Sequence, residues 1–76
     1  MGVMRILDRT GDTVVAWAVD DPTTLAAAEA QFARLAAEGK IPFARPAGGT
    51  AREAERIRRF DPGLDEIVWV RPVAGG

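Results

Sequence analysis

Two short runs of apolar and β-branched residues open the chain, with a turn signal between them. The first run spans Met4 to Leu7, and the second, Thr13 to Val19, is rich in β-branched and aromatic residues. Between them, Asp8 to Asp12 supplies turn chemistry, and Gly11 is free to take a positive φ. This pattern predicts a β-hairpin, with Trp17 in the core and its indole N–H in need of a partner.

A long helical pattern follows the hairpin. Asp21 is placed to cap the helix, Pro22 fits the first helical position, and Gly39 is typical of the residue that follows a helix. The segment "TTLAAAEAQFARLAAE" between them has strong helix propensity, so we expect one main helix over about residues 22–38. Its apolar stripe, expected to face the core, consists of Leu25, Ala28, Phe32, Leu35 and Ala36.

The middle of the chain gives weaker signals. Ile41 to Arg45 is a short extended piece, and because Pro42 cannot donate to a ladder, we predict an edge strand there. Helical intervals and capping-box spacing favour a helix for residues 50–60, whereas "ERIRRF" fits equally well a strand that is exposed on one face. The sequence leaves this segment open between helix and strand.

The last predicted strand, residues 66–73, is apolar on both faces. Ile67 and Trp69 belong to one face, and Val68 and Val70 belong to the other. Such a strand is either buried on both sides or presents a half-exposed apolar face for docking. Since a single main helix can cover only one face of a sheet, we predict a docking face that includes Val68 and Val70.

Length and composition fit one small globular domain. The chain has 76 residues, of which 47% are hydrophobic and 28% charged, and its net charge is −1. A domain of this size buries about 60% of its unfolded surface, so its core is thin. We expect a domain over residues 1–73 and a tail over 74–76. No apolar run approaches the roughly 20 residues of a membrane span, so no membrane contact and a cytoplasmic location are expected.

The side chains that the sequence lacks restrict its chemistry. It has no Cys, His, Ser, Tyr or Asn, which excludes disulfides, Cys/His metal sites and Ser/His or Cys/His nucleophiles. The adjacent carboxylates Asp20-Asp21 and Asp65-Glu66 are the remaining acid/base candidates. Neighbouring acids on a helix or strand do not face each other, so we expect no enzyme, no cofactor and no metal site.

One basic cluster stands out in an otherwise mixed charge pattern. It contains Arg52, Arg56, Arg58 and Arg59, with two glutamates among them. A solvated charged face explains this pattern better than a nucleic-acid contact, so no nucleic-acid partner is expected. The weaker alternative, a nucleic-acid accessory protein, would show strong salt dependence of binding.

The opening "MRILDRTGDTVVAWAVDDPTTL" resembles the first hairpin of ubiquitin, and Thr10-Gly11-Asp12-Thr13 carries the likeness. The order of hairpin, helix, short edge strand, connecting segment and final strand is that of the β-grasp fold. The resemblance therefore implies an α+β fold: a mixed sheet of four to five strands, the first and last parallel and adjacent, with the helix packed across it.

The ending "DEIVWVRPVAGG" is similar to the sulfur-carrier branch of the ubiquitin-like superfamily. The small subunit of molybdopterin synthase typically ends on a strand after Asp-Glu, followed by Pro-Pro-Val, a small residue and Gly-Gly. Arg71 replaces the first proline and is similar to the basic tail of ubiquitin, while "KIPFARPAGGTAREAERIRRF" fits neither template. The matching residues are Asp65, Glu66, Pro72, Val73, Ala74, Gly75 and Gly76.

This resemblance implies that an adenylating enzyme of the ubiquitin-activating type condenses the carboxylate of Gly76 with ATP. The acyl-adenylate then passes to a sulfur source, giving a thiocarboxylate, or to a cysteine and then an amine. Gly75 and Gly76 lack a Cβ and suit a narrow channel, and Pro72 stiffens the segment before them. The tail expected to bind the activating enzyme is Arg71, Pro72, Val73 and Ala74.

Two classes of function remain open at this point. In the first, the chain is a ubiquitin-like carrier or modifier; the tail favours sulfur carriage, the hairpin favours conjugation, and Lys40 is the only lysine. In the second, it is a non-conjugated β-grasp adaptor that binds a protein through its sheet face. The expected partners are the adenylating enzyme and a synthase or conjugation partner, and the protein alone is expected to be a monomer.

Overall fold

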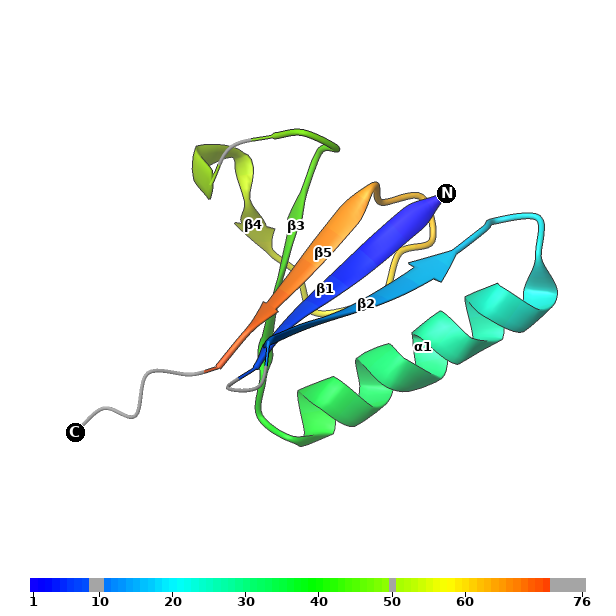
Figure 1. The fold of residues 1–76 in the computed structure, drawn as a ribbon, viewed down its shortest axis with the longest axis horizontal. Helices are drawn as coiled ribbons and strands as arrows, with labels where there is room; N and C mark the ends of the chain where they lie inside the picture. The colour runs from blue at the N-terminus through cyan, green and yellow to red at the C-terminus, as the bar shows by residue number, and fades with distance from the viewer. Residues whose placement is uncertain (9–10, 50, 72–76) are drawn as a thin grey trace.

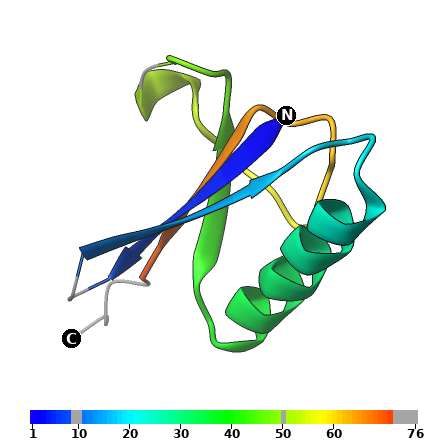
Figure 2. The same ribbon diagram turned by 45° about the vertical axis from the view of Figure 1, so that its right-hand side comes forward.

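The computed structural model describes residues 1–8, 11–49 and 51–71. One helix packs against one face of a twisted sheet, and within these described residues no helix covers the other face (Figures 1 and 2). The elements in chain order are β1 (Gly2–Asp8), β2 (Gly11–Trp17), α1 (Pro22–Ala37), β3 (Ile41–Arg45), the 3₁₀ helix η1 (Ala51–Glu53), β4 (Glu55–Arg56) and β5 (Glu66–Val70).

The five strands form a single mixed sheet in the order β2-β1-β5-β3-β4. β1 and β5 are parallel, while β1 and β2, β3 and β5, and β3 and β4 are antiparallel. The predicted pairing of the first and last strands is confirmed. The protein is therefore an α+β protein whose arrangement is consistent with the β-grasp description.

The hairpin forms, but its strands begin earlier than predicted. β1 starts at Gly2 and not at Met4, and β2 runs from Gly11 to Trp17, two residues before the expected range. Gly11 has the expected positive φ, 122°, although it is the first residue of the strand. β2 ends because the N–H of Ala18 donates to Thr24 Oγ1, 3.0 Å away, which ties the chain to the start of the helix.

The start and end of α1 are as predicted from local signals. Asp21 Oδ1 accepts hydrogen bonds from the backbone N–H groups of Thr23 and Thr24, at 3.0 and 3.3 Å. Pro22 is the first helical residue, and Gly39 has a φ of 90°, in the left-handed region that favours glycine. The helix therefore begins and ends where its own sequence specifies.

The core lies between α1 and the sheet. Trp17 is buried and its Nε1–H donates to the carbonyl of Pro62 at 3.1 Å, which supplies the partner that the sequence required. Ala36, predicted for the core stripe, is exposed because it lies on the flank of α1, and Leu25 is partly buried. The core cluster consists of Met4, Ile6, Trp17, Ala28, Phe32, Leu35, Ile67 and Trp69.

The predicted edge position of β3 is wrong. β4 pairs with it through Phe43–Arg56 and Ala44–Glu55, so β3 lies inside the sheet and β4 forms its edge. Pro42 is compatible with this position although it has no N–H to donate. Its carbonyl still takes part in the pairing, because it accepts a hydrogen bond from the N–H of Ile57 at 3.2 Å.

The segment left open between helix and strand contains a short piece of each. Ala51–Glu53 makes one turn of 3₁₀ helix, and Glu55–Arg56 then forms β4. A helix of so few residues is marginal by itself, since isolated helices shorter than about 12–15 residues are barely stable in water. Pairing with β3 therefore decides the conformation. β5 also ends earlier than predicted, at Val70, with Arg71 outside the strand.

Candidate docking surface

The sheet face opposite α1 is the candidate functional surface, and we call it the open face. Side chains alternate between the two faces along each strand. Since Ile67 and Trp69 point into the core, Val68 and Val70 point away from it. The strand pairings place the following residues on the same face: Val3, Arg5, Leu7, Val14, Ala16, Ile41, Phe43, Arg45, Arg56, Glu66, Val68 and Val70.

Apolar side chains make up much of the open face. Val68 and Val70 are half-buried, and their β3 partners Phe43 and Ile41 are half-buried too. Towards β2 the apolar residues are more accessible, and Val14 is 53% exposed. The structure thus places the two predicted docking valines on an accessible sheet face, beside Phe43 and Ile41 of β3, while Arg5 of β1 lies opposite Val68.

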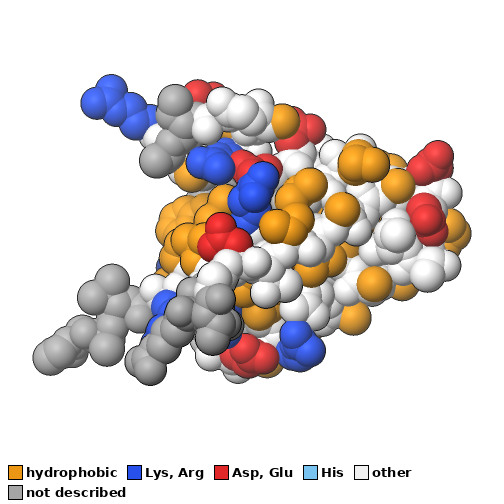
Figure 3. All heavy atoms as spheres, viewed as in Figure 1, with side chains coloured by type: hydrophobic (Ala, Val, Ile, Leu, Met, Phe, Trp, Pro, Cys, Tyr) orange, Lys and Arg blue, Asp and Glu red, His pale blue; other side chains and the backbone are white. Residues whose placement is uncertain are grey.

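An ion-pair triad that the sequence did not reveal lies on the open face, at the end of the sheet where β5 begins and β3 ends. Arg5 Nε donates to Glu66 Oε2 at 2.7 Å, and Arg45 Nε donates to Glu66 Oε1. The Glu66 side chain is only 11% exposed, whereas those of Arg5 and Arg45 are 45% and 30% exposed. Figure 3 shows basic and acidic side chains grouped over the sheet beside apolar ones. The triad carries a net charge of +1 within an apolar surface.

The two arginines determine the ionisation of Glu66. The hydrogen bond from Arg45, followed by that from Arg5, lowers the pKa of Glu66 below its ordinary value of 4.5, against the opposing effect of burial. In return, the Glu66 carboxylate raises the pKa of Arg45. Glu66 is therefore ionised in the folded protein, and its two carboxylate oxygens are both occupied by the neighbouring guanidinium groups.

We expect the triad to make the stability of the fold sensitive to acid. Because the folded-state pKa of Glu66 is lowered, its contribution is fully present above the unfolded value of about 4.5 and is lost as the pH falls through the folded value. The wild type should have a larger free energy of unfolding than Glu66→Gln. This difference should be constant near neutral pH and should shrink below about pH 4.5. Urea unfolding of both proteins across this range measures it; a difference that stays constant down to about pH 3 would contradict the assignment.

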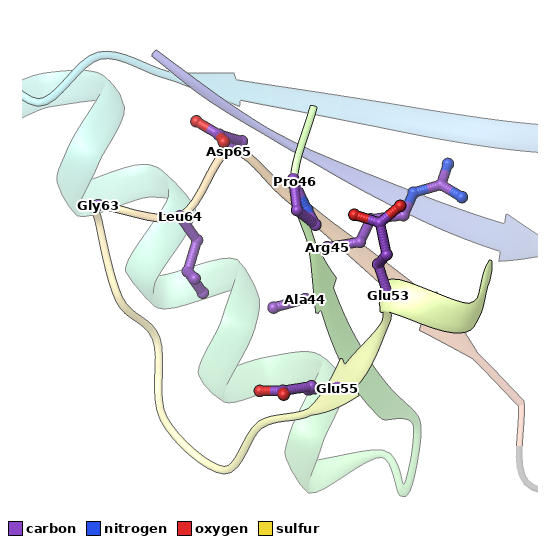
Figure 4. A pocket seen from close by; sticks show the side chains of 8 residues that line it. All are labelled: Ala44, Arg45, Pro46, Glu53, Glu55, Gly63, Leu64 and Asp65. Carbon is purple, nitrogen blue, oxygen red and sulfur yellow. The ribbon is translucent and has the colours of Figure 1, made fainter. Parts of the chain in front are cut away.

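The two adjacent carboxylates at the start of β5 are separated in space. Glu66 belongs to the open face, while Asp65 lines an open cavity of about 350 Å³ between β3, β4 and the chain before β5. Figure 4 shows Leu64 and Glu55 pointing into this cavity and the guanidinium group of Arg45 pointing away from it. Asp65 and Glu66 therefore do not form an acid/base pair.

The arginine cluster is also divided. Arg56 lies opposite Phe43 on the open face, whereas Arg58 and Arg59 line a cavity of about 440 Å³ beside Phe32 of α1. These basic side chains consequently belong to different sides of the sheet and do not make one continuous basic surface. Nucleic-acid binding through a single arginine patch gains no support from this placement.

Two further observations concern only the described residues. Within them, no helix is both long enough and apolar enough to cross a membrane. In the same part of the chain, no three acidic side chains come together in a group that could hold a metal ion.

The predicted tail lies almost wholly outside the described residues. Arg71 is described and exposed, but Pro72, Val73, Ala74, Gly75 and Gly76 are not among them. What the structure does place is the strand that leads to this segment. β5 lies in the interior of the sheet, between β1 and β3, and carries Val68 and Val70 immediately before Arg71.

No protein-family model, curated protein or solved structure matches this chain.

Proposed function

We propose that this protein is a ubiquitin-like carrier or modifier that is activated at the carboxylate of Gly76 by an adenylating enzyme. The observation that carries the proposal is the arrangement of β5. The strand presents Val68 and Val70 on the open face, and the segment Arg71–Gly76 follows it directly. A partner that docks on the open face would therefore lie next to the segment that it must bind for activation.

The chemistry of the segment agrees with this role. Two glycines at its end allow close approach of a backbone to a reactive centre, since they carry no Cβ. The proposal requires Gly76 to carry a free carboxylate in the mature protein. Sulfur transfer through a thiocarboxylate and conjugation to an amine both begin with the same acyl-adenylate, so the segment alone does not separate them.

A non-conjugated adaptor is the second candidate, and the triad of Arg5, Glu66 and Arg45 favours it. The triad adds a net charge of +1 to an accessible apolar face, which favours a partner of opposite charge and needs no activated terminus to act. An adaptor would use the same open face as a carrier. The two candidates therefore differ in the fate of Gly76 and not in the docking surface.

The deciding experiment is an intact-mass measurement of the protein isolated from its own host, with fragmentation of the C-terminal peptide. Replacement of one terminal oxygen by sulfur would identify a sulfur carrier, and a Gly76 carbonyl joined to an amine would identify a modifier. An unmodified Gly76 carboxylate under all growth conditions, or a mature chain in which Gly76 is not terminal, would contradict the proposal and favour the adaptor.

A variant that lacks Gly76 provides the matched control. Because Gly76 lies beyond the last strand, the deletion should leave thermal stability unchanged while removing every C-terminal modification. If the variant still retains a partner that Val68→Asp loses, the open face binds independently of the tail. This result would separate docking from activation.

A further inference from the structure

One edge of the sheet is formed by β2, and its outward backbone groups can be identified. The N–H of Val3 donates to the carbonyl of Asp65 at 3.1 Å. The backbone N–H and C=O groups of Val3 and of every second residue after it in β1 therefore point towards β5. The backbone N–H and C=O groups of the even-numbered residues of β1 then point towards β2, where they pair with the odd-numbered residues. The N–H and C=O groups of Asp12, Val14 and Ala16 therefore point outwards, away from β1.

This edge lacks the features that usually prevent strands of two molecules from pairing. β2 pairs with β1 over seven consecutive residues without a bulge, and it contains no proline and no lysine. Its only charged residue, Asp12, lies near one end, and Val14 at its centre is 53% exposed. The opposite edge, β4, is a two-residue strand of charged side chains, Glu55 and Arg56. Of the two sheet edges formed by the described residues, the β2 edge is therefore the one open to pairing.

We propose that two copies of this chain associate by antiparallel pairing of their β2 strands, about a two-fold axis that passes through Val14. In this register Val14 lies opposite Val14 of the other copy, and Asp12 lies opposite Ala16. Each outward N–H and C=O group of the three residues then meets a partner. The two sheets become one continuous sheet of ten strands, following from the five in each copy.

The pattern of charge and exposure along β2 favours a second copy as the occupant. The pairing buries the two exposed Val14 side chains against each other, a favourable cross-strand contact. The two Asp12 carboxylates lie towards opposite ends of the paired strands, so no like charges face each other. β2 is the outermost strand in Figure 1, with α1 on one face of the sheet, so a two-fold axis perpendicular to the sheet sets both helices on the same face.

This association does not rest on the proposed function, although Val14 and Ala16 of β2 also belong to the open face. It uses the strand furthest from β3 and β4, and β1 separates it from the strand that carries Val68 and Val70. A dimer of this kind differs from the monomer expected from the sequence. A seven-residue edge is smaller than a standard stable interface, so the dimer should be in reversible equilibrium and should form at micromolar to millimolar concentration.

The first test is sedimentation equilibrium of the purified full chain from micromolar to millimolar concentration. The wild type should show a monomer–dimer equilibrium, and Val14→Lys should weaken it by about tenfold or more, because two lysines would face each other at the axis. Val19→Lys is the matched control: Val19 is similarly exposed, at 56%, but lies beyond the end of β2. It should leave the equilibrium unchanged.

The second test fixes the register by disulfide formation. Residues in a hydrogen-bonded antiparallel pair have Cα atoms about 5.5 Å apart, within the range for a disulfide. Because the chain has no cysteine, Val14→Cys should give a covalent dimer on mild oxidation, whereas Val19→Cys should stay monomeric. An equimolar mixture of Asp12→Cys and Ala16→Cys should form the mixed dimer.

The outcomes that overturn the proposal are specific. A wild type that stays monomeric up to millimolar concentration would refute it, as would a dimer that Val14→Lys does not weaken. Cross-linking of Val19→Cys in place of Val14→Cys would refute the register. Circular dichroism of each variant confirms that it is folded, and neither test depends on activation at Gly76, so the result stands apart from the fate of the proposed function.

Discussion

Trp69→Ala is expected to remove most of the stability of this protein. The Trp69 side chain is completely buried in β5, the strand between β1 and β3. Its ring meets that of Phe32 edge to face, with centroids 4.8 Å apart, and its Nε1–H lies 3.3 Å from Met4 Sδ. Truncating such a residue costs about 3–5 kcal/mol, and a domain of this length has about 4–11 kcal/mol in total. Urea unfolding followed by circular dichroism measures the loss.

Val68→Ala provides the control for this prediction because it changes the neighbouring residue of the same strand. Val68 is half-buried on the open face, so its truncation should cost only about 1 kcal/mol. Equal losses for the two variants would mean that the open face is as well packed as the core. The folded Val68→Ala protein is also suited to binding assays, in which a weakened partner interaction would support docking on this face.

Gly2→Val is the second substitution with a large expected effect. Gly2 pairs with Trp17 across the hairpin, and a Cβ at position 2 would lie 2.1 Å from Trp17 Cζ2 and 2.3 Å from Cε2. Trp17 cannot move away freely, since it is buried and its indole N–H is bonded to the Pro62 carbonyl. Displacing β1 instead would disturb the hydrogen bond from Val3 to Asp65. We expect a loss of about 3 kcal/mol and a melting temperature about 15 °C lower.

Differential scanning calorimetry measures this effect, and Gly63→Ala is the control. A Cβ at Gly63 would meet only the Asp61 carboxylate, at 3.3 Å, in an exposed turn where a shift of a few tenths of an ångström relieves the contact without breaking the 2.9 Å hydrogen bond from the Gly63 N–H to Asp61 Oδ1. Its cost should be within about 0.5 kcal/mol. If Gly2→Val melted within a few degrees of the wild type, the close packing of Trp17 over Gly2 would not contribute to stability.

The sequence specified the elements that depend on short-range interactions. The helix could be predicted from the cap at Asp21, the proline after it and the glycine at position 39, because these residues act on backbone groups a few positions away. The alternation of Ile67 and Trp69 with Val68 and Val70 likewise predicted two faces of one strand, and the structure places the first pair in the core.

Strand boundaries were less predictable because they depend on pairing partners. β1 begins at Gly2, a residue with weak strand propensity, since the Trp17 side chain needs the space above a residue without a Cβ. The segment after residue 50 contains both a 3₁₀ turn and a short strand because β3 offers it an edge. Neither the start of β1 nor the conformation of the segment after residue 50 can be predicted from the local sequence.

The candidate site shows the same division. The two docking valines follow from periodicity within five residues, whereas Arg5, Arg45 and Glu66 meet across sequence separations of 61 and 21 residues. The open β2 edge is likewise visible only once the strand order is known. The sequence alone determined the helix, the hairpin and the apolar periodicity, because they depend on neighbouring residues. Only the tertiary structure decided the strand limits, the ion-pair triad and the free edge, because each depends on which distant segments pair.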